Sequence, residues 1–168
     1  MLFDLKDPDA AGLITLYFNE ERKKNKTIGL TSGCFDLIHF QHFWYFIRCK
    51  RHCDILVVGV DSDEMVRKEK GPHRPFIFDF KRAIMVDALK PVSFVLVMNR
   101  PEDLRTAASL IRPNFLFRNN DFAGKENEIW GKEFADEIVI IYDVEDHNST
   151  TEISKKIAKQ LIDQKEGL

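Results

Sequence analysis

The chain has 168 residues, and its 25 Lys and Arg residues nearly balance 27 Asp and Glu residues, leaving a formal net charge of −2. A chain of this length with 44% hydrophobic residues has enough apolar surface to form one compact domain without disulfides. The near-neutral balance argues against nucleic acid or an anionic membrane as the main partner. Any anion-binding site is therefore expected to be local.

No segment of the sequence has the pattern of a targeting or membrane-spanning segment. The first residues lack a basic stretch followed by an apolar run, and no apolar run approaches the roughly 18 residues of a membrane span. The chain has three cysteines, Cys34, Cys49 and Cys53, and this odd number fits reduced thiols better than a disulfide scaffold. We expect a cytoplasmic protein with no membrane partner and no nucleic-acid partner.

Predicted strands and helices alternate along the chain. The first helix is expected between Asp7-Pro8 and the basic run Arg22-Lys23-Lys24. The predicted strands then cover residues 27–31, 54–60, 93–98, 114–117 and 137–142. The predicted helices lie near residues 39–52, 62–68, 78–89, 101–111, 126–136 and 149–164.

This βαβ series predicts an α/β fold with a Rossmann-like, doubly wound, parallel five-stranded sheet and helices on both faces. Residues 1–26 are expected to form an added N-terminal helical extension, and residues 27–168 the main part of a single compact domain.

The stretch after the first predicted strand carries the strongest functional signal. Residues 33–42 read Gly-Cys-Phe-Asp-Leu-Ile-His-Phe-Gln-His, so a tight turn leads into a helix with His39 and His42 on one face. Unpaired N–H groups at that helix start favour an anion at the carboxyl edge of the sheet, and two imidazoles can donate hydrogen bonds to phosphate. Taken alone, the two histidines would fit a turn or packing role better, and the surrounding ten residues favour the phosphate role instead.

Three later segments carry polar residues suited to a phosphate ligand. Lys70, Arg74 and Arg82 are cations that either clamp phosphates or lie on a solvated surface. Ser149, Thr150 and Thr151 either cap the last helix or hold a phosphate, and one helix start can do both. The run Arg118-Asn-Asn-Asp121 follows a predicted strand, where ligands of open α/β sheets bind, although it is also ordinary turn chemistry.

Together these segments resemble the cytidylyltransferase-like nucleotidyltransferases. Residues 33–42 are similar to the signature Gly-x-Phe-Asp-x-x-His-x-Gly-His, and residues 148–153 to the Ser-Thr-Thr motif before the family's last helix. Residues 70–82, with Arg-Pro-x6-Arg spacing, resemble the substrate loop of the heptose-1-phosphate adenylyltransferases. Residues 117–122 stand where that family has a Lys-Gly-Gly-Asp-Tyr-like stretch. The resemblance covers about residues 27 to 160.

The resemblance implies transfer of a nucleoside monophosphate from ATP or CTP to a phosphorylated sugar or alcohol, with Mg²⁺ on the triphosphate and a homodimeric assembly. The residues it assigns to catalysis are His39, His42, Lys70 and Arg74, and those it assigns to the substrate phosphate are Arg82 and Asp63. The residues it assigns to the nucleotide are Gly33, Cys34, Phe35, Asp36, Gln41, Arg118, Asn120, Asp121, Ser149, Thr150 and Thr151. For Asp36 and Asp63, a purely structural role in a turn or a helix start remains an alternative.

Gln41 departs from the family pattern, because the family has Gly between the two histidines. A glutamine adds bulk and an amide where a bare backbone lets the nucleotide approach closely. Three readings stay open: an adenylyltransferase of a sugar phosphate, a cytidylyltransferase of a phosphoalcohol such as glycerol 3-phosphate, and a nucleotide-binding regulatory module without turnover.

Overall fold

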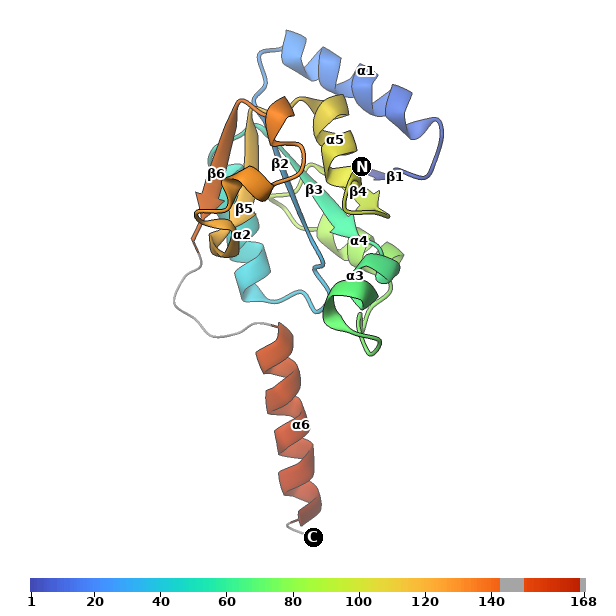
Figure 1. Ribbon diagram of the computed structural model, residues 1–168, viewed down its shortest axis with the longest axis vertical. Helices are drawn as coiled ribbons and strands as arrows, with labels where there is room; N and C mark the ends of the chain where they lie inside the picture. The colour runs from blue at the N-terminus through green and yellow to red at the C-terminus, as the bar shows by residue number, and fades with distance from the viewer. Residues whose placement is uncertain (143–149, 167–168) are drawn as a thin grey trace.

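The computed structural model describes residues 1–142 and 150–166 of the chain. Its centre is a six-stranded sheet in the order β1-β4-β3-β2-β5-β6, with every neighbouring pair parallel. Helices cover both faces of this sheet (Figure 1). The strands are β1 (Leu2–Asp4), β2 (Ile28–Gly33), β3 (Ile55–Asp61), β4 (Phe94–Met98), β5 (Phe115–Asn119) and β6 (Glu137–Ile141). The predicted Rossmann-like α/β fold is confirmed.

The helices between the strands begin and end close to the predicted positions. They are α1 (Ala10–Lys23), α2 (Phe40–Lys50), α3 (Asp63–Lys70), α4 (Asp79–Asp87), α5 (Asp103–Ile111) and α6 (Thr150–Glu166). In Figure 1, α6 extends away from the body of the molecule. Its first residue stays attached, because the Thr150 hydroxyl donates a hydrogen bond of 3.3 Å to the main-chain oxygen of Leu37. No helix in the described part of the chain is both long and apolar enough to cross a bilayer.

Two apolar clusters, one on each face of the sheet, form the core. Alternation along β3 sends Val57 to the cluster under α1 and α5, and Val58 to the cluster under α2 and α4. Both valines are fully buried. A strand that is buried on both faces consists of consecutive apolar residues, and the sequence of β3 has this pattern.

The prediction of five strands is wrong, because Leu2–Asp4 forms a sixth strand at the edge of the sheet. Leu2 pairs in register with Val95 of β4, and the Phe3 ring stacks on Phe94 with centroids 5.2 Å apart. Three residues are too few to show a strand period, and the partner that makes them a strand lies about 90 residues away. The N-terminal segment therefore supplies a strand as well as a helix, and the division at residue 26 stays a prediction.

The helix predicted near residues 126–136 is also wrong. This segment contains two short 3-10 turns, Glu126–Glu128 and Lys132–Phe134, separated by Gly131. Gly131 adopts a left-handed backbone with φ of 84°, and a Cβ there would lie 2.7 Å from the Cβ of Ala108. A left-handed residue packed against α5 interrupts any regular helix.

Candidate active site

A large cavity lies at the carboxyl edge of the sheet. Its volume is about 1740 Å³. In the sheet order, β2 lies between β3 and β5. The chain adds β3, β4 and β1 on one side of β2 and β5 and β6 on the other side, so the strand order reverses at β2. Open α/β sheets bind their ligands at such a switch point. The sequence-predicted residues that line the cavity are Gly33, Cys34, Phe35, His39, Gln41, His42, Lys70, Arg74, Arg118, Asn120, Asp121, Thr150 and Thr151.

The two histidines form a stacked pair at the start of α2. Their ring centroids are 3.9 Å apart, with 30° between the ring planes, and Phe35 packs edge-on against His42. The Nδ1 atoms of both rings are buried, and neither has a hydrogen-bond partner among the described residues. Buried polar atoms are normally paired, so this pair is suited to a ligand that enters the cavity.

Both imidazoles are neutral in the free protein near pH 7. Burial, together with His39 and Lys70, lowers the pKa of His42 to about 3, and burial lowers the pKa of His39. A triphosphate brought to this helix start would reverse that balance, because its negative charge favours protonated imidazoles.

Asp36 holds the loop between α3 and α4 in place from beneath the cavity. Its buried carboxylate accepts hydrogen bonds from Arg74 Nε at 2.7 Å, from the Phe76 amide at 2.9 Å and from the Ile77 amide at 3.0 Å. Asp36 itself does not line the cavity. The contact it makes positions Arg74, whose guanidinium also lies 4.7 Å over the Phe76 ring.

Arg82 and Asp63 lie behind the cavity wall, and the structure does not bring them to the ligand site. Arg82 has no exposed surface, and it donates to the main-chain oxygens of Cys34 and Ile77. Its third nitrogen pairs with Asp63 at 2.8 Å, and the same carboxylate accepts the Asp79 amide at 2.8 Å. This buried network holds the turn after β2 against the start of α4.

The end of β5 and the residues that follow it also line the cavity. Arg118 donates to Ser32 Oγ at 2.7 Å and lies 4.1 Å over the Phe122 ring. Its Nε is buried without a hydrogen-bond partner among the described residues, and burial lowers its pKa. Asn119 donates to Asp121 at 2.7 Å, which shapes the following turn. Ser149 lies outside the described residues.

Several further residues line the cavity and were not predicted from the sequence, namely Ser32, Tyr45, Asp61 and Trp130. Tyr45 lies one turn after His42, and its hydroxyl is 2.8 Å from Thr31 Oγ1. Ser32 and Asp61 stand at strand ends, and the rule that ligands bind at carboxyl strand ends points to them. Trp130 belongs to the irregular segment that was predicted to be helical, so its position had no sequence signal.

Comparison with known proteins agrees with this geometry. The Cytidylyltransferase-like family model matches residues 30–157. The chain belongs to the cytidylyltransferase-like family. This confirms the resemblance found in the sequence motifs and identifies the chain as a nucleotidyltransferase domain.

Curated relatives of this chain include the bifunctional protein HldE from two Campylobacter species. The chain is 35% identical over 155 residues to that of Campylobacter jejuni subsp. doylei, covering 92% of this chain and 32% of the relative. It is 38% identical over 135 residues to that of Campylobacter fetus subsp. fetus, covering 80% of this chain and 29% of the relative. The chain thus spans about a third of the length of these relatives.

Among solved structures, a lipopolysaccharide core biosynthesis protein from Thermoplasma volcanium has the same fold. The TM-score is 0.61 at 22% identity, and the match covers 71% of this chain and 99% of that one. The agreement extends to the layered parallel sheet, and it supports the fold alone.

Proposed function

We propose that the chain transfers a nucleoside monophosphate from ATP or CTP to a phosphorylated sugar or alcohol and releases pyrophosphate. The observation that carries this proposal is the stacked pair of His39 and His42 at a helix start that lines the cavity, with buried Nδ1 atoms that have no hydrogen-bond partner in the described part of the chain. Helix starts favour phosphate, and neutral imidazoles add directed hydrogen bonds to phosphate oxygens.

In the proposed reaction, an oxygen of the acceptor phosphate attacks the α-phosphorus of the triphosphate, and the bond to pyrophosphate breaks. The acceptor phosphate is already anionic near neutral pH, so the protein needs no nucleophile of its own, and catalysis comes from positioning and charge stabilisation. His39 and His42 stabilise the triphosphate in the transition state, while Lys70 and Arg74 hold the acceptor and leaving phosphates. Thr150 and Thr151 hold the outer phosphates of the nucleotide, and Ser149 belongs to the same proposal.

We assign Mg²⁺ to the triphosphate rather than to a site made by side chains. Among the described residues, no group of three or more His, Cys, Asp or Glu side chains is arranged to hold a metal ion. Mg²⁺ in phosphoryl-transfer sites keeps several waters and binds chiefly to substrate phosphates, so a protein cage is not required. Mg²⁺ bound in this way offsets negative charge on the transferring group.

The nucleotide is proposed to lie between the turn of residues 33–36 and the end of β5 with the residues that follow it. Gly33, Cys34 and Phe35 line one side, and Arg118, Asn120 and Asp121 line the other. Gln41 lines the cavity beside His42 and is the residue on which the choice between ATP and CTP is proposed to depend.

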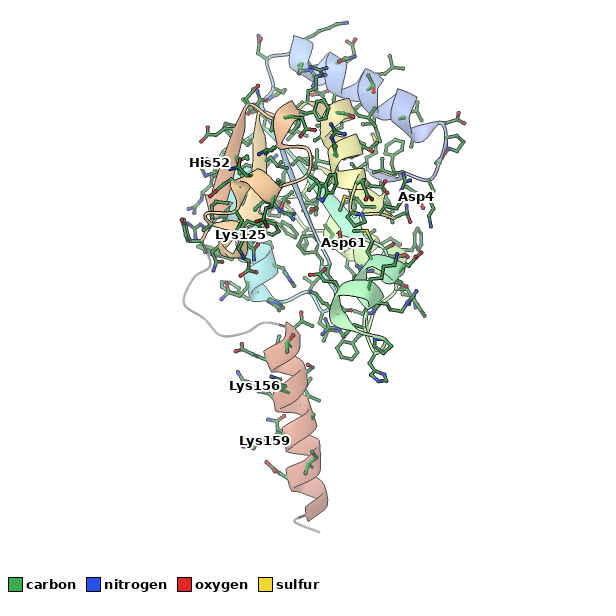
Figure 2. All side chains as sticks on the ribbon, in the orientation of Figure 1. Asp4, His52, Asp61, Lys125, Lys156 and Lys159 are labelled. Atoms are coloured by element: carbon green, nitrogen blue, oxygen red, sulfur yellow. The ribbon has the colours of Figure 1, made fainter. Side chains whose placement is uncertain are left out.

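The proposal is tested by measuring pyrophosphate release with ATP and with CTP against heptose 1-phosphate, hexose 1-phosphates, glycerol 3-phosphate and ethanolamine phosphate. His42→Ala is expected to lower kcat by about a hundredfold, as loss of a transition-state hydrogen bond does. His52→Ala is the matched control, because His52 is exposed and lies outside the cavity (Figure 2). Nucleotide binding in a calorimeter without pyrophosphate release from any acceptor would favour the regulatory module instead.

Two further expectations belong to this proposal. A cytoplasmic location fits the three cysteines, which are all buried and unpaired. A homodimer fits the apolar surface at the start of α2, where the Phe40 ring is 58% exposed and stacks on the partly buried Trp44 ring with centroids 5.9 Å apart. Light scattering on wild type and Phe40→Glu tests the dimer, which the charge is expected to dissociate.

A further inference from the structure

The turn between β2 and α2 contains a bulky residue in a backbone conformation that normally suits glycine. Phe35 has a φ of 47°, which lies in the left-handed region, and its side chain is only 6% exposed. An aromatic residue in this region is strained, and such strain persists only where the surrounding contacts enforce it. Glycine would adopt this turn freely, so we expect the phenylalanine ring itself to have a role.

The two residues at the centre of this turn contact two different parts of the candidate active site. The Phe35 ring packs edge-on against the His42 ring. The carboxylate of the next residue, Asp36, accepts the 2.7 Å hydrogen bond from Arg74 Nε. A single turn therefore links the histidine pair to the loop that carries Arg74.

The orientation of the His42 imidazole depends on ring contacts. Its buried Nδ1 atom has no hydrogen-bond partner in the described part of the chain, although a functional imidazole is commonly oriented by a hydrogen bond at its second nitrogen. The rings that touch it are His39, stacked at 3.9 Å between centroids, and Phe35, at 5.4 Å with 78° between the planes. Since His39 belongs to the pair, Phe35 is the ring that orients His42 from outside the pair.

The Phe35 ring is itself held in place by Gly33, the last residue of β2. A Cβ on Gly33 would lie 3.0 Å from the Phe35 Cζ atom and 3.3 Å and 3.4 Å from its two Cε atoms. Gly33 does not have a positive φ, so the close approach of the ring, and not the backbone conformation, requires a glycine there. On the α2 side, the Phe46 ring lies 5.0 Å from the Phe35 ring. The ring is therefore enclosed by Gly33, Phe46 and His42.

We propose that Phe35 is a positioning residue that holds the His42 imidazole in the orientation needed for transfer, and that Gly33 acts through the Phe35 ring. This inference rests on the proposed nucleotidyl transfer, in which His42 stabilises the transition state. Phe35 acts through His42 and has no contact with the reacting atoms in this role. Loss of the ring is therefore expected to lower kcat more than it raises KM for the triphosphate.

The test compares two phenylalanine-to-leucine variants. Phe35→Leu keeps an apolar side chain in the turn but removes the aromatic edge contact with His42. Phe94→Leu is the matched control, because Phe94 is 1% exposed, begins β4 and lies outside the cavity. We expect Phe35→Leu to lower kcat about tenfold or more, with KM for the triphosphate within about twofold of wild type. Phe94→Leu is expected to lower the urea midpoint without changing kcat.

Gly33→Ala tests whether the glycine acts through the ring, and it also provides a variant that keeps Phe35 if Phe35→Leu does not fold. The added methyl pushes the ring by a few tenths of an ångström, so kcat is expected to fall. The loss is expected to be smaller in the Phe35→Leu background, because the close contact is already gone. Gly12→Ala is the control, since a Cβ there meets nothing within 4 Å. Equal losses in both backgrounds would overturn the role of Gly33.

Nuclear magnetic resonance of the His42 ring gives a readout that does not depend on turnover. Burial, together with His39 and Lys70, lowers the pKa of His42 to about 3. Both charged neighbours remain in the variants, so removing the ring that covers His42 is expected to raise this pKa in Phe35→Leu and not in Phe94→Leu.

The outcomes separate this inference from the proposed function. An unchanged His42 pKa in Phe35→Leu, or equal losses of kcat in Phe35→Leu and Phe94→Leu, would overturn the positioning role. A raised KM with unchanged kcat would also overturn it, because Phe35 would then contact the nucleotide directly. Absence of pyrophosphate release by wild type, together with a raised His42 pKa in Phe35→Leu, would overturn the proposed function and support the control of His42 by Phe35.

Discussion

The Asp36 carboxylate pairs with Arg74 Nε at 2.7 Å across 38 residues of sequence, and both side chains are largely buried. This pair joins the turn after β2 to the loop that carries Arg74 into the cavity. The same carboxylate also accepts two main-chain amides, so one side chain orders both the loop and its cation.

Removing that carboxylate is expected to destabilise the fold and disorder the Arg74 loop together. Asp36→Ala leaves two amides and a guanidinium without their acceptor, which costs about 3 kcal/mol or more of unfolding free energy. Urea denaturation measures the loss. Asp121→Ala is the control, because Asp121 is exposed and its hydrogen bond to Asn119 is local. A loss below about 1 kcal/mol for Asp36→Ala would show that the loop is held by other contacts.

Arg82 is expected to act through stability rather than through direct contact with phosphate. Arg82→Lys keeps the charge but cannot reach Cys34, Ile77 and Asp63 at once, because a single ammonium lacks the planar fork. We expect a loss of about 3 kcal/mol in unfolding free energy. Differential scanning calorimetry measures it, with the exposed Lys81→Arg exchange as control. Unchanged stability with a raised KM for the acceptor would instead place Arg82 in contact with substrate.

The contrast between Arg82 and the histidine pair shows where sequence reasoning reaches its limit. His39 and His42 lie three residues apart on one helix, so local periodicity alone places both at the same helix start, and the structure has them stacked there. Arg82 and Asp63 are 19 residues apart on two helices, and only the packed fold reveals that they neutralise each other behind the wall. The sequence therefore shows which residues are cationic, but it does not show which of them are exposed to a ligand and which are buried in ion pairs.

The same reasoning explains the errors and omissions elsewhere in the chain. Strands β2 to β6 contain apolar residues in longer runs and were predicted, whereas β1 has only three residues and becomes a strand only through pairing with β4. The family resemblance assigned Asp63 to the substrate phosphate, and nothing in the sequence singled out Asp61 two residues earlier. Their burial partners distinguish them, since Asp63 is paired with Arg82 and Asp61 lines the cavity without a partner in the described chain.

The histidine pair is expected to make the free protein less stable in acid. His42 has a pKa of about 3 in the fold and about 6.5 when unfolded, so the unfolded chain binds more protons between these values. The contribution of His42 to the unfolding free energy is therefore complete above pH 6.5 and is lost progressively as the pH falls toward 3. From pH 7 to pH 5 the contribution of His42 to unfolding free energy is expected to drop by about 1–2 kcal/mol.

Chemical denaturation of wild type and His42→Gln at a series of pH values isolates this effect, because glutamine has no titration in the range. The difference in unfolding free energy between wild type and His42→Gln is expected to become smaller as the pH is lowered. A saturating triphosphate is expected to oppose the acid loss, since its charge favours the protonated ring. A pH-independent difference would mean that His42 is not held neutral by burial.

Gln41 is expected to set affinity for the nucleotide rather than the chemical step. Gln41→Gly restores the bare backbone that the family has between its histidines, at a cost of about 1 kcal/mol in helix stability.

Steady-state kinetics with ATP and CTP, at saturating acceptor, test this role. If the Gln41 amide contacts the base or ribose, its loss is worth about 0.5–1.5 kcal/mol, so the ratio of kcat/KM for the two nucleotides shifts about twofold to tenfold. Gln160→Gly on the exposed part of α6 is the control, because Gln160 lies far along that helix and outside the cavity. A large rise in kcat with both nucleotides would show that Gln41 obstructs transfer, and an unchanged ratio would remove it from nucleotide selection.

Asp61→Asn is expected to stabilise the folded protein at neutral and alkaline pH, because burial raises the pKa of the Asp61 carboxyl. The carboxyl has a pKa of about 6 in the fold and about 3.9 when unfolded, so the folded state binds more protons between these values. Stability from this group is present below pH 3.9 and is lost as pH rises through 6. The charged groups that act on it are Glu69, which raises its pKa, and Lys70, Arg82 and Arg118, which lower it.

Replacing the charge with a neutral amide removes this penalty, so we expect Asp61→Asn to raise the unfolding free energy by about 2 kcal/mol at pH 8 and by little at pH 4. Asp54→Asn gives the opposite sign, because Thr27 lowers the pKa of Asp54 through hydrogen bonds to its ionised form. Urea denaturation at the two pH values measures both variants. If Asp61→Asn were destabilising at pH 8, the ionised carboxylate would be contributing to the stability of the fold.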